Sequence, residues 1–419
     1  MGIAAMDTTG GDARPPERLD HQAMGPLAGL RVIEIGTLIA APFASRILGE
    51  FGAEVIKVEQ PGAGDPLRVW RKMHGDTSIW WYLQSRNKKS VAIDLRTAEG
   101  QEIVRELAKD ADVIIENFRP GVMEKWNLGW EQLSAVNSKL TLVRISGYGQ
   151  SGPYSTRPGF GAVGEAMGGL RYTTGEPDRP PARVGVSIGD SLASLHAVIG
   201  ALMSVLHVKA NNGPGQVVDV SLYESVFNVM ESLVPEYDLF GQVRERSGGA
   251  LPGICPSNTY PTRDDRFVVI AGNGDSIFKR LMLVIGRPDM AEESALANNS
   301  GRVPYAARID ECIAVWTRQR TLAEVLAELS AVDVPAGQIY SAAEIVEDPH
   351  YQARDMILDA DLPDGTRVKF PGIAPKLSLT PGGMRWAGPA LGAHTDEVLT
   401  TLGADIARIA ELRAKGVVA

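Results

Sequence analysis

The fold is decided by the stretch LRVIEIGTLIAAPFASRILGEFGAEVIKVEQPGAGDP, residues 30–66. An apolar run covers 30–35, helical spacing follows over 42–52, and a second apolar run covers 54–59 before a Pro- and Gly-rich turn. A strand, a helix and a strand within about 30 residues form a βαβ unit, which implies a parallel sheet. The stretch therefore predicts an α/β protein.

The same alternation continues along the chain. We expect further strands at 90–95, 113–117, 140–145 and 216–221, and helices at 98–109, around Trp130 and Leu133, at 191–209 and near 222–232. These elements indicate an open, Rossmann-like parallel sheet. A loop at 241–262, a strand at 266–270 and helices near 276–285 and 321–329 predict a smaller α/β segment, and a closing helix is expected around 395–414.

Composition limits the possible functions. The chain has 419 residues, 44% of them hydrophobic, and a net charge of -9, which argues against nucleic acid as a partner. Cys255 and Cys312 are too few for a disulfide framework or a cysteine metal site. We expect residues 1–25 to be a disordered leader rather than a signal peptide, no membrane association, and a cytoplasmic location.

Three motifs of cofactor, metal or hydrolase chemistry are incomplete or absent in the sequence. GxGxxG strings occur at 147–152 and 159–164, but neither has the strand, turn and helix register that places a dinucleotide pyrophosphate at a helix N-terminus. The six histidines form no HxxxH or HExxH pair, so no metal site is expected. A GxSxG nucleophile elbow is absent as well.

Asp190 stands out in the segment VGVSIGDSLA, residues 184–193. A strand-like apolar run ends at a Gly-Asp step, and a long apolar helix begins at once. Asp190 is either a helix N-cap or a nucleophile whose reaction is helped by backbone N–H groups and the helix dipole. The pattern itself leaves both interpretations open.

Eight segments resemble the class III CoA-transferases, the family of formyl-CoA transferase and carnitine CoA-transferase. They are PLAGLRVIEIG, LGEFGAEVIKVEQPGAGDPLR, NKKSVAIDLRTAEG, DVIIENFRPGV, ISGYGQSGPY, VSIGDSLAS, GQVVDVSLYES and LGAHTDEVL, in order from about residue 26 to 398. The resemblance implies that Asp190 is the catalytic aspartate. It also implies two chains interlocked like linked rings, with a large domain at 26–225, a small domain with linkers at 226–345, and a tail at 346–419 that returns to the large domain.

The resemblance further implies a set of coenzyme contacts. They are Ile39, Ala40, Gln60, Ile93, Asp94, Leu95, Arg96, Asn117, Phe118, Arg119, Lys125, Gly159, Phe160 and Gly161. The cations among them are expected near the coenzyme phosphates. Gln60 departs from the formyl-CoA transferase branch, which has Arg there, and a glycine-rich loop is only faintly repeated at 247–253. Formyl-CoA and oxalate are therefore doubtful substrates.

The implied reaction uses Asp190 to attack an acyl-CoA, passing through mixed anhydrides and an aspartyl-CoA thioester to a free carboxylic acid acceptor. CoA and acyl-CoA are then substrates, and no permanently bound cofactor is expected. Succinyl-CoA with a short dicarboxylate is the first choice, with Arg46, Arg71 or Arg157 as a clamp for the second carboxylate. One alternative is an α-methylacyl-CoA racemase-like enzyme, although residues 159–162 of this chain contain no acid or base where the racemase branch has an Asp. The other alternative is a non-catalytic acyl-CoA binding protein.

Overall fold

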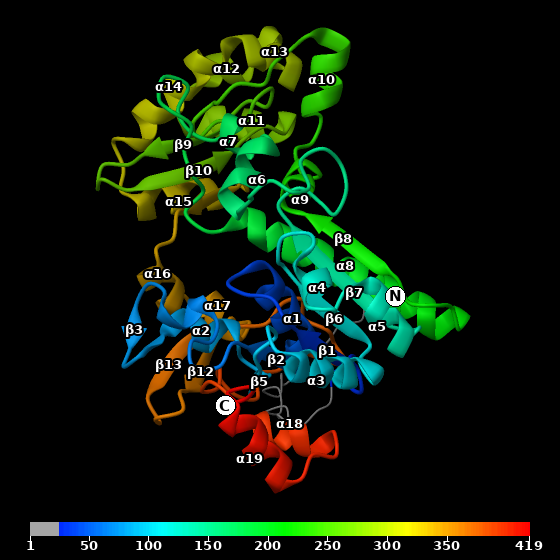
Figure 1. Cartoon of the computed structure of the whole chain (residues 1–419). Helices are drawn as coiled ribbons and strands as arrows, with labels where there is room; N and C mark the ends of the chain where they lie inside the picture. Colours follow the sequence, from blue (N-terminus) through cyan, green and yellow to red (C-terminus); the bar gives the residue numbers. More distant parts are fainter. Residues whose placement is uncertain (1–24) are drawn as a thin grey trace, which may run out of the picture.

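The computed structural model describes residues 25–419, and the predicted leader otherwise lies outside the described residues. Its centre is a six-stranded sheet in the order β5-β2-β1-β6-β7-β8 (Figure 1). All neighbouring strands are parallel, with Val32 of β1 paired to Val55 of β2 and Val113 of β6. The predicted α/β fold with a parallel sheet is confirmed, and this strand order is that of doubly wound nucleotide-binding folds.

The strands of the central sheet are β1 (Arg31–Glu34), β2 (Glu54–Glu59), β5 (Lys88–Ala92), β6 (Val113–Glu116), β7 (Thr141–Ser146) and β8 (Val217–Ser221). Its helices and connections are α1 (Ala40–Glu50), η1 (Pro66–Val69), β3 (Met73–His74), β4 (Thr77–Ser78), α2 (Ile79–Gln84), α3 (Ala98–Lys109), α4 (Val122–Lys125), α5 (Trp130–Val136), α6 (Gly161–Met167), α7 (Leu170–Thr173), α8 (Ile188–Asn211), α9 (Leu222–Phe227) and α10 (Leu233–Phe240).

The remaining elements are β9 (Ser257–Pro261), β10 (Phe267–Ala271), α11 (Asp275–Val284), α12 (Pro288–Ala291), η2 (Ser294–Leu296), α13 (Asn299–Arg302), η3 (Val303–Tyr305), α14 (Ala306–Thr317), α15 (Leu322–Ser330), β11 (Ala336–Gln338), α16 (Ala342–Glu347), α17 (Pro349–Ala353), β12 (Ile357–Asp361), β13 (Arg367–Pro371), α18 (Thr395–Thr401) and α19 (Ile406–Ala414). The strands β11-β10-β9 form an antiparallel sheet.

Helices cover both faces of the central sheet because its strands are apolar on both sides. Val32 packs with α1 and α8, whereas its neighbour Ile33 packs with α3 on the opposite face. Leu399 of α18 and Leu412 of α19 join the α3 side, so the end of the chain completes a core begun more than 300 residues earlier (Figure 1).

A separate core is built only from residues between Cys255 and Val334, around β10, α11 and α14. We propose that this core belongs to the small domain at 226–345 and that the tail at 346–419 belongs to the large one. The packing of α18 and α19 against α3 supports that division.

Four local expectations were wrong. The segment 184–187 before Asp190 is irregular and not a strand, the closing helix is broken between α18 and α19, and the expected loop at 241–262 contains β9. The helix near 222–232 ends at Phe227. Sequence periodicity does not show these features, because it records the spacing of apolar residues and not where tertiary contacts begin or end an element.

Candidate active site

Asp190 is the third residue of α8, and Ser187 occupies the N-cap position. The interpretation of Asp190 as an N-cap is therefore wrong. Its side chain is half-buried within the first helical turn, where the helix dipole and unpaired backbone N–H groups favour negative charge.

The first turn of α6 lies against the Asp190 carboxylate. A β-carbon placed on Gly161 would lie only 2.2 Å from Oδ2 of Asp190, so a side chain at position 161 would occupy the space of the carboxylate. Of the predicted loop at 159–161, Gly161 is buried and Phe160 is exposed beside it. Gly161 therefore allows the loop to approach Asp190 closely.

Local electrostatics give Asp190 an unusual protonation behaviour. Burial raises the pKa of Asp190 to about 6, the carboxylate of Glu165 adds to the rise, and the Arg183 guanidinium opposes it. An ordinary aspartate has a pKa near 4, so the Asp190 carboxylate is a stronger base than most. A pKa raised in this way is typical of catalytic carboxyl groups.

The backbone of the segment after β1 lies beside Asp190. The Ser194 hydroxyl oxygen is 2.7 Å from both the Asp190 carbonyl oxygen and that of Ala40. The predicted coenzyme contacts Ile39 and Ala40 thus lie next to the start of α8. Ala40 is buried, and Ile39 is partly accessible.

Two polar side chains, the partly buried Asn117 and the buried Asp65, fix this segment. Asn117 donates to and accepts from the backbone of Thr37, each hydrogen bond being 2.8 Å long. Leu38 has a φ of 65°, an unfavourable value for leucine, and its N–H donates to the carboxylate of Asp65, which is also paired with Lys57. The Asn117 amide is occupied in shaping this loop.

A second group of predicted contacts gathers at the ends of β2 and β5. Asp94 forms a two-pronged ion pair with Arg96, at 2.8 and 2.7 Å. Hydrogen bonds from Arg96, and a smaller contribution from Gln60, hold the pKa of Asp94 at about 2. Ile93 and Leu95 are buried, so they present backbone rather than side chains. Arg96 remains exposed beside its partner.

The remaining contacts follow β6. Phe118 packs edge-on against Trp126, with ring centroids 5.0 Å apart. Arg119 and Lys125 are exposed, and neither side chain forms an ion pair or hydrogen bond with any residue of 25–419. These two cations are therefore available to a phosphorylated ligand, and Arg96 is already partly neutralised by Asp94.

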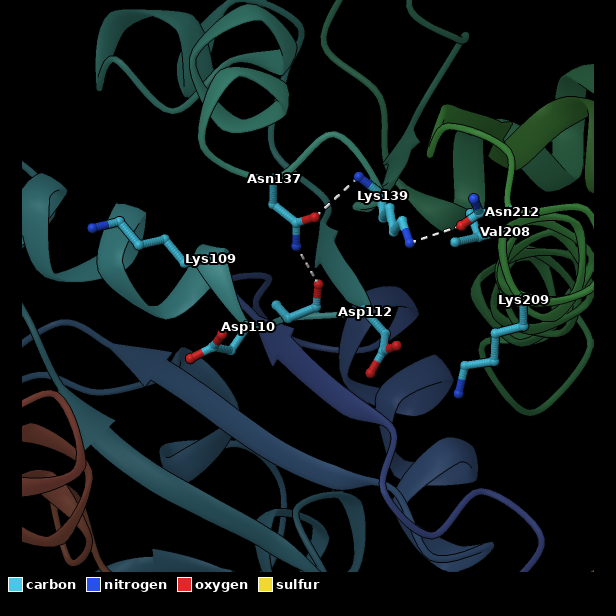
Figure 2. Close-up of a pocket in the computed structure, with 9 residues that line it drawn as sticks. Lys109, Asp110, Asp112, Asn137, Lys139, Val208, Lys209 and Asn212 are labelled. Carbon is cyan, nitrogen blue, oxygen red and sulfur yellow. Dashed lines mark hydrogen bonds between the residues drawn. The ribbon is translucent and has the colours of Figure 1, made fainter.

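Strand order brings these groups to one edge. The segments that follow β5, β2, β1 and β6 all leave the carboxyl ends of parallel strands, and the strand order reverses at β1. In doubly wound sheets, ligands bind at that edge and at that reversal point. A cavity of about 340 Å³ lies instead before β6 and β7, at the opposite edge (Figure 2), where Lys139 donates to Asn212. That cavity is remote from Asp190.

The two glycine strings have a packing role. A β-carbon on Gly147 would lie 2.9 Å from the α-carbon of Gly159, and one on Gly159 would lie 2.8 Å from that of Gly147. The strings therefore permit close contact between two loops, in agreement with their rejection as a dinucleotide fingerprint. Within 25–419, no group of three or more His, Cys, Asp or Glu side chains is placed to hold a metal ion.

Three residues of this site were not identified from the sequence: Glu165, Arg171 and Arg183. The one available signal was spacing, because Glu165 lies four residues after Gly161 and hence on the same face of α6. Arg183 lies in the irregular segment before α8, where periodicity carries no information.

A doubly wound sheet with a half-buried carboxylate of raised pKa at a helix start, and with cations at the carboxyl edge that are unpaired within residues 25–419, is typical of an enzyme acting on a nucleotide-containing substrate. Residues 27–395 match the family described as CoA-transferase family III, and the chain belongs to that family. It is a CoA-transferase, with CoA thioesters as substrates, and the resemblance seen in the sequence is confirmed.

Relatives agree with this assignment. A succinyl-CoA–D-citramalate CoA-transferase of Chloroflexus aurantiacus is 48% identical over 97% of this chain and 99% of that protein. A succinate–glutarate CoA-transferase of Agrobacterium fabrum is 33% identical over 90% of this chain and 96% of its own length. The crystal structure of a CAIB/BAIF family protein from Brucella suis, 34% identical, superimposes with a TM-score of 0.80 over 90% of this chain and 99% of that chain.

Proposed function

We propose that this CoA-transferase moves CoA from succinyl-CoA to a short dicarboxylic acid, with Asp190 as the covalent nucleophile. The observation that carries the choice of substrates is the near full-length similarity to a succinyl-CoA–D-citramalate CoA-transferase. The racemase-like and non-catalytic alternatives find no support among the named relatives, which are transferases.

The proposed chemistry proceeds in balanced steps. A carboxylate oxygen of Asp190 attacks the thioester carbonyl, the C–S bond breaks, and CoA leaves as a thiolate. The thiolate then attacks the aspartyl carbonyl of the mixed anhydride, which releases the donor acid as a carboxylate and leaves an aspartyl-CoA thioester. An acceptor carboxylate reverses both steps. The positive end of the helix dipole at the start of α8 supports the oxyanions that form.

The coenzyme is proposed to lie along the carboxyl edge, with Arg119 and Lys125 toward its phosphates and the backbone of residues 93–95 beside its base. The cations predicted to clamp a second carboxylate have other contacts. Arg46 is paired with Glu50, Arg71 stacks on the Trp80 ring, and Arg157 stacks on the Tyr154 ring. The positive charge of Arg183 lowers the pKa of the Asp190 carboxyl group. The Arg183 side chain has no ion pair or hydrogen bond with another described side chain. We therefore propose Arg183 as the clamp.

A donor–acceptor matrix tests the substrate assignment. Succinyl-CoA, acetyl-CoA and butyryl-CoA are each paired with four- and five-carbon dicarboxylates and with butyrate, and the CoA products are read by mass spectrometry. We expect succinyl-CoA and a dicarboxylate to be the fastest pair, and Arg183→Gln to raise the acceptor KM roughly tenfold to a hundredfold for dicarboxylates alone. A wild-type preference for butyrate would contradict the assignment.

We also propose that the enzyme is an interlocked homodimer. The apolar side chains of Leu195, Ile199, Met203 and Leu206 follow one face of α8 and are 46–67% exposed in the single chain. By length and composition α8 would also suit a membrane span, but its other face packs against α1 and β7 in the core. An apolar stripe of this length is typical of a protein interface. A cytoplasmic location stays a prediction.

Replacement of Met203 by lysine tests that interface. We expect Met203→Lys to prevent assembly while the chains fold and so to yield monomer, because a charged side chain would have to be desolvated in the interface. Wild-type dimer, once formed, should persist on dilution, since linked chains cannot part without unfolding. Mass photometry measures both. Ile406→Lys on α19, where Ile406 is 88% exposed away from the stripe, is the matched control. A monomeric wild type, or an unaltered dimer of Met203→Lys, would contradict the proposal.

A further inference from the structure

A second carboxylate is buried beside Asp190. The side chain of Glu165 is inaccessible to solvent, and its Oε1 accepts a hydrogen bond of 3.4 Å from the N–H of Gly189, the residue directly before Asp190. Its Oε2 lies 3.3 Å from Nε of Arg171, its ion-pair partner. Glu165 thus connects α6 and α7 to the first turn of α8.

A charged group is not needed for the hydrogen bond from Gly189. A glutamine would accept the same hydrogen bond from Gly189 without placing negative charge near a second carboxylate. Burying Glu165 here is unfavourable for the ionised Asp190, as the raised pKa of Asp190 reflects. Among the described residues, Arg183 is the other charged group acting on Asp190, while α1 contributes the uncharged Ala40 carbonyl and Glu224 of α9 bonds to Tyr223.

We propose that Glu165 is a positioning residue that displaces Asp190 from its free carboxylate state toward its acylated states. The inference rests on the proposed covalent role of Asp190. When the aspartyl-CoA thioester forms, the bond between the aspartyl carbonyl carbon and the bridging oxygen of the anhydride breaks, and the negative charge leaves on the donor acid. Acylation, like protonation, therefore removes the charge that Glu165 repels, so the same neighbour favours both.

The paired variants Glu165→Gln and Arg171→Gln test the proposal with effects of opposite sign. Each purified full-length enzyme is mixed with succinyl-CoA without acceptor, and the aspartyl-CoA thioester is quantified by mass spectrometry across pH. Wild type is expected to lose thioester formation as the pH falls through about 6, because a protonated Asp190 is not a nucleophile. In Glu165→Gln this acid limb moves to lower pH, although burial, the larger cause, still holds the pKa of Asp190 above its ordinary value. In Arg171→Gln it moves upward, because Glu165 then lacks its cation.

The amount of intermediate gives an independent measure. At pH 7.5 the equilibrium ratio of thioester to free enzyme is expected to fall in Glu165→Gln by roughly tenfold for each pH unit that the limb has moved. Glu131→Gln on α5, which removes an exposed carboxylate, is the control and should match wild type. Protonation of succinyl-CoA affects wild type and every variant equally, so it does not alter the difference between their pH profiles.

The outcomes separate this inference from the proposed function. Unchanged acid limbs in both variants, with Asp190→Asn inactive, would overturn the role of Glu165 and leave the nucleophile standing. Thioester formation by Asp190→Asn would overturn the proposed function itself. If Glu165→Gln does not fold, the upward shift expected of Arg171→Gln still decides the question.

Discussion

Asp190→Asn is expected to lower CoA transfer by a factor on the order of 10⁴ or more, because an amide cannot form the anhydride or the thioester. Glu165 cannot replace Asp190 as the nucleophile. The neighbouring carboxylate of Glu165 is buried and held by Gly189 and Arg171. Initial rates with succinyl-CoA and a dicarboxylate measure the loss, and hydroxylamine treatment of wild type during turnover should label Asp190 in the peptide map.

Stability provides the control for that variant. Since the folded-state pKa of Asp190 is raised above that of an unfolded aspartate, its ionisation destabilises the fold progressively between about pH 4 and pH 6, and fully above that range. Removing the charge should therefore raise the melting temperature at pH 7.5, and this gain should disappear as the pH falls toward 4. Transfer near the wild-type rate, or an unlabelled peptide after turnover with donor, would contradict the covalent mechanism.

Gly161→Ala is expected to lower the transfer rate about a hundredfold, since a displacement of the order of 1 Å at a reacting group has such an effect. The added methyl would lie 2.2 Å from Oδ2 of Asp190, so either the carboxylate or the loop must move. Binding of free CoA, measured by calorimetry, should change far less, because most predicted coenzyme contacts lie in the segments that follow β1, β2, β5 and β6, away from Gly161.

Gly185→Ala is the matched control for Gly161→Ala. Gly185 precedes Asp190 in the same region, and a β-carbon there would meet no atom within 4 Å. Its activity should equal that of wild type. Equal rates for Gly161→Ala and Gly185→Ala would show that Asp190 acts from a position different from the one in this structure.

The periodic part of the fold was predictable from the sequence. The strand at 54–59 and the helix at 98–109 were predicted with the bounds that β2 and α3 have, because both are bounded by turn residues and have clear apolar spacing. The break between α18 and α19 was missed, since helical residues continue on both sides of Gly403. The role of Asn117 was also missed: its amide shapes the Thr37 backbone, a contact across 80 residues.

By itself, the sequence determined a parallel α/β sheet, because apolar runs and turn residues alternate in a local pattern, and its motifs identified the CoA-transferase family and Asp190 as the candidate nucleophile. Tertiary structure alone decided what surrounds Asp190. Gly161 and Glu165 come from α6, and the neighbouring Ala40 carbonyl begins α1. Such proximity depends on how helices pack across the sheet, which no local periodicity records, and that packing sets the protonation of Asp190.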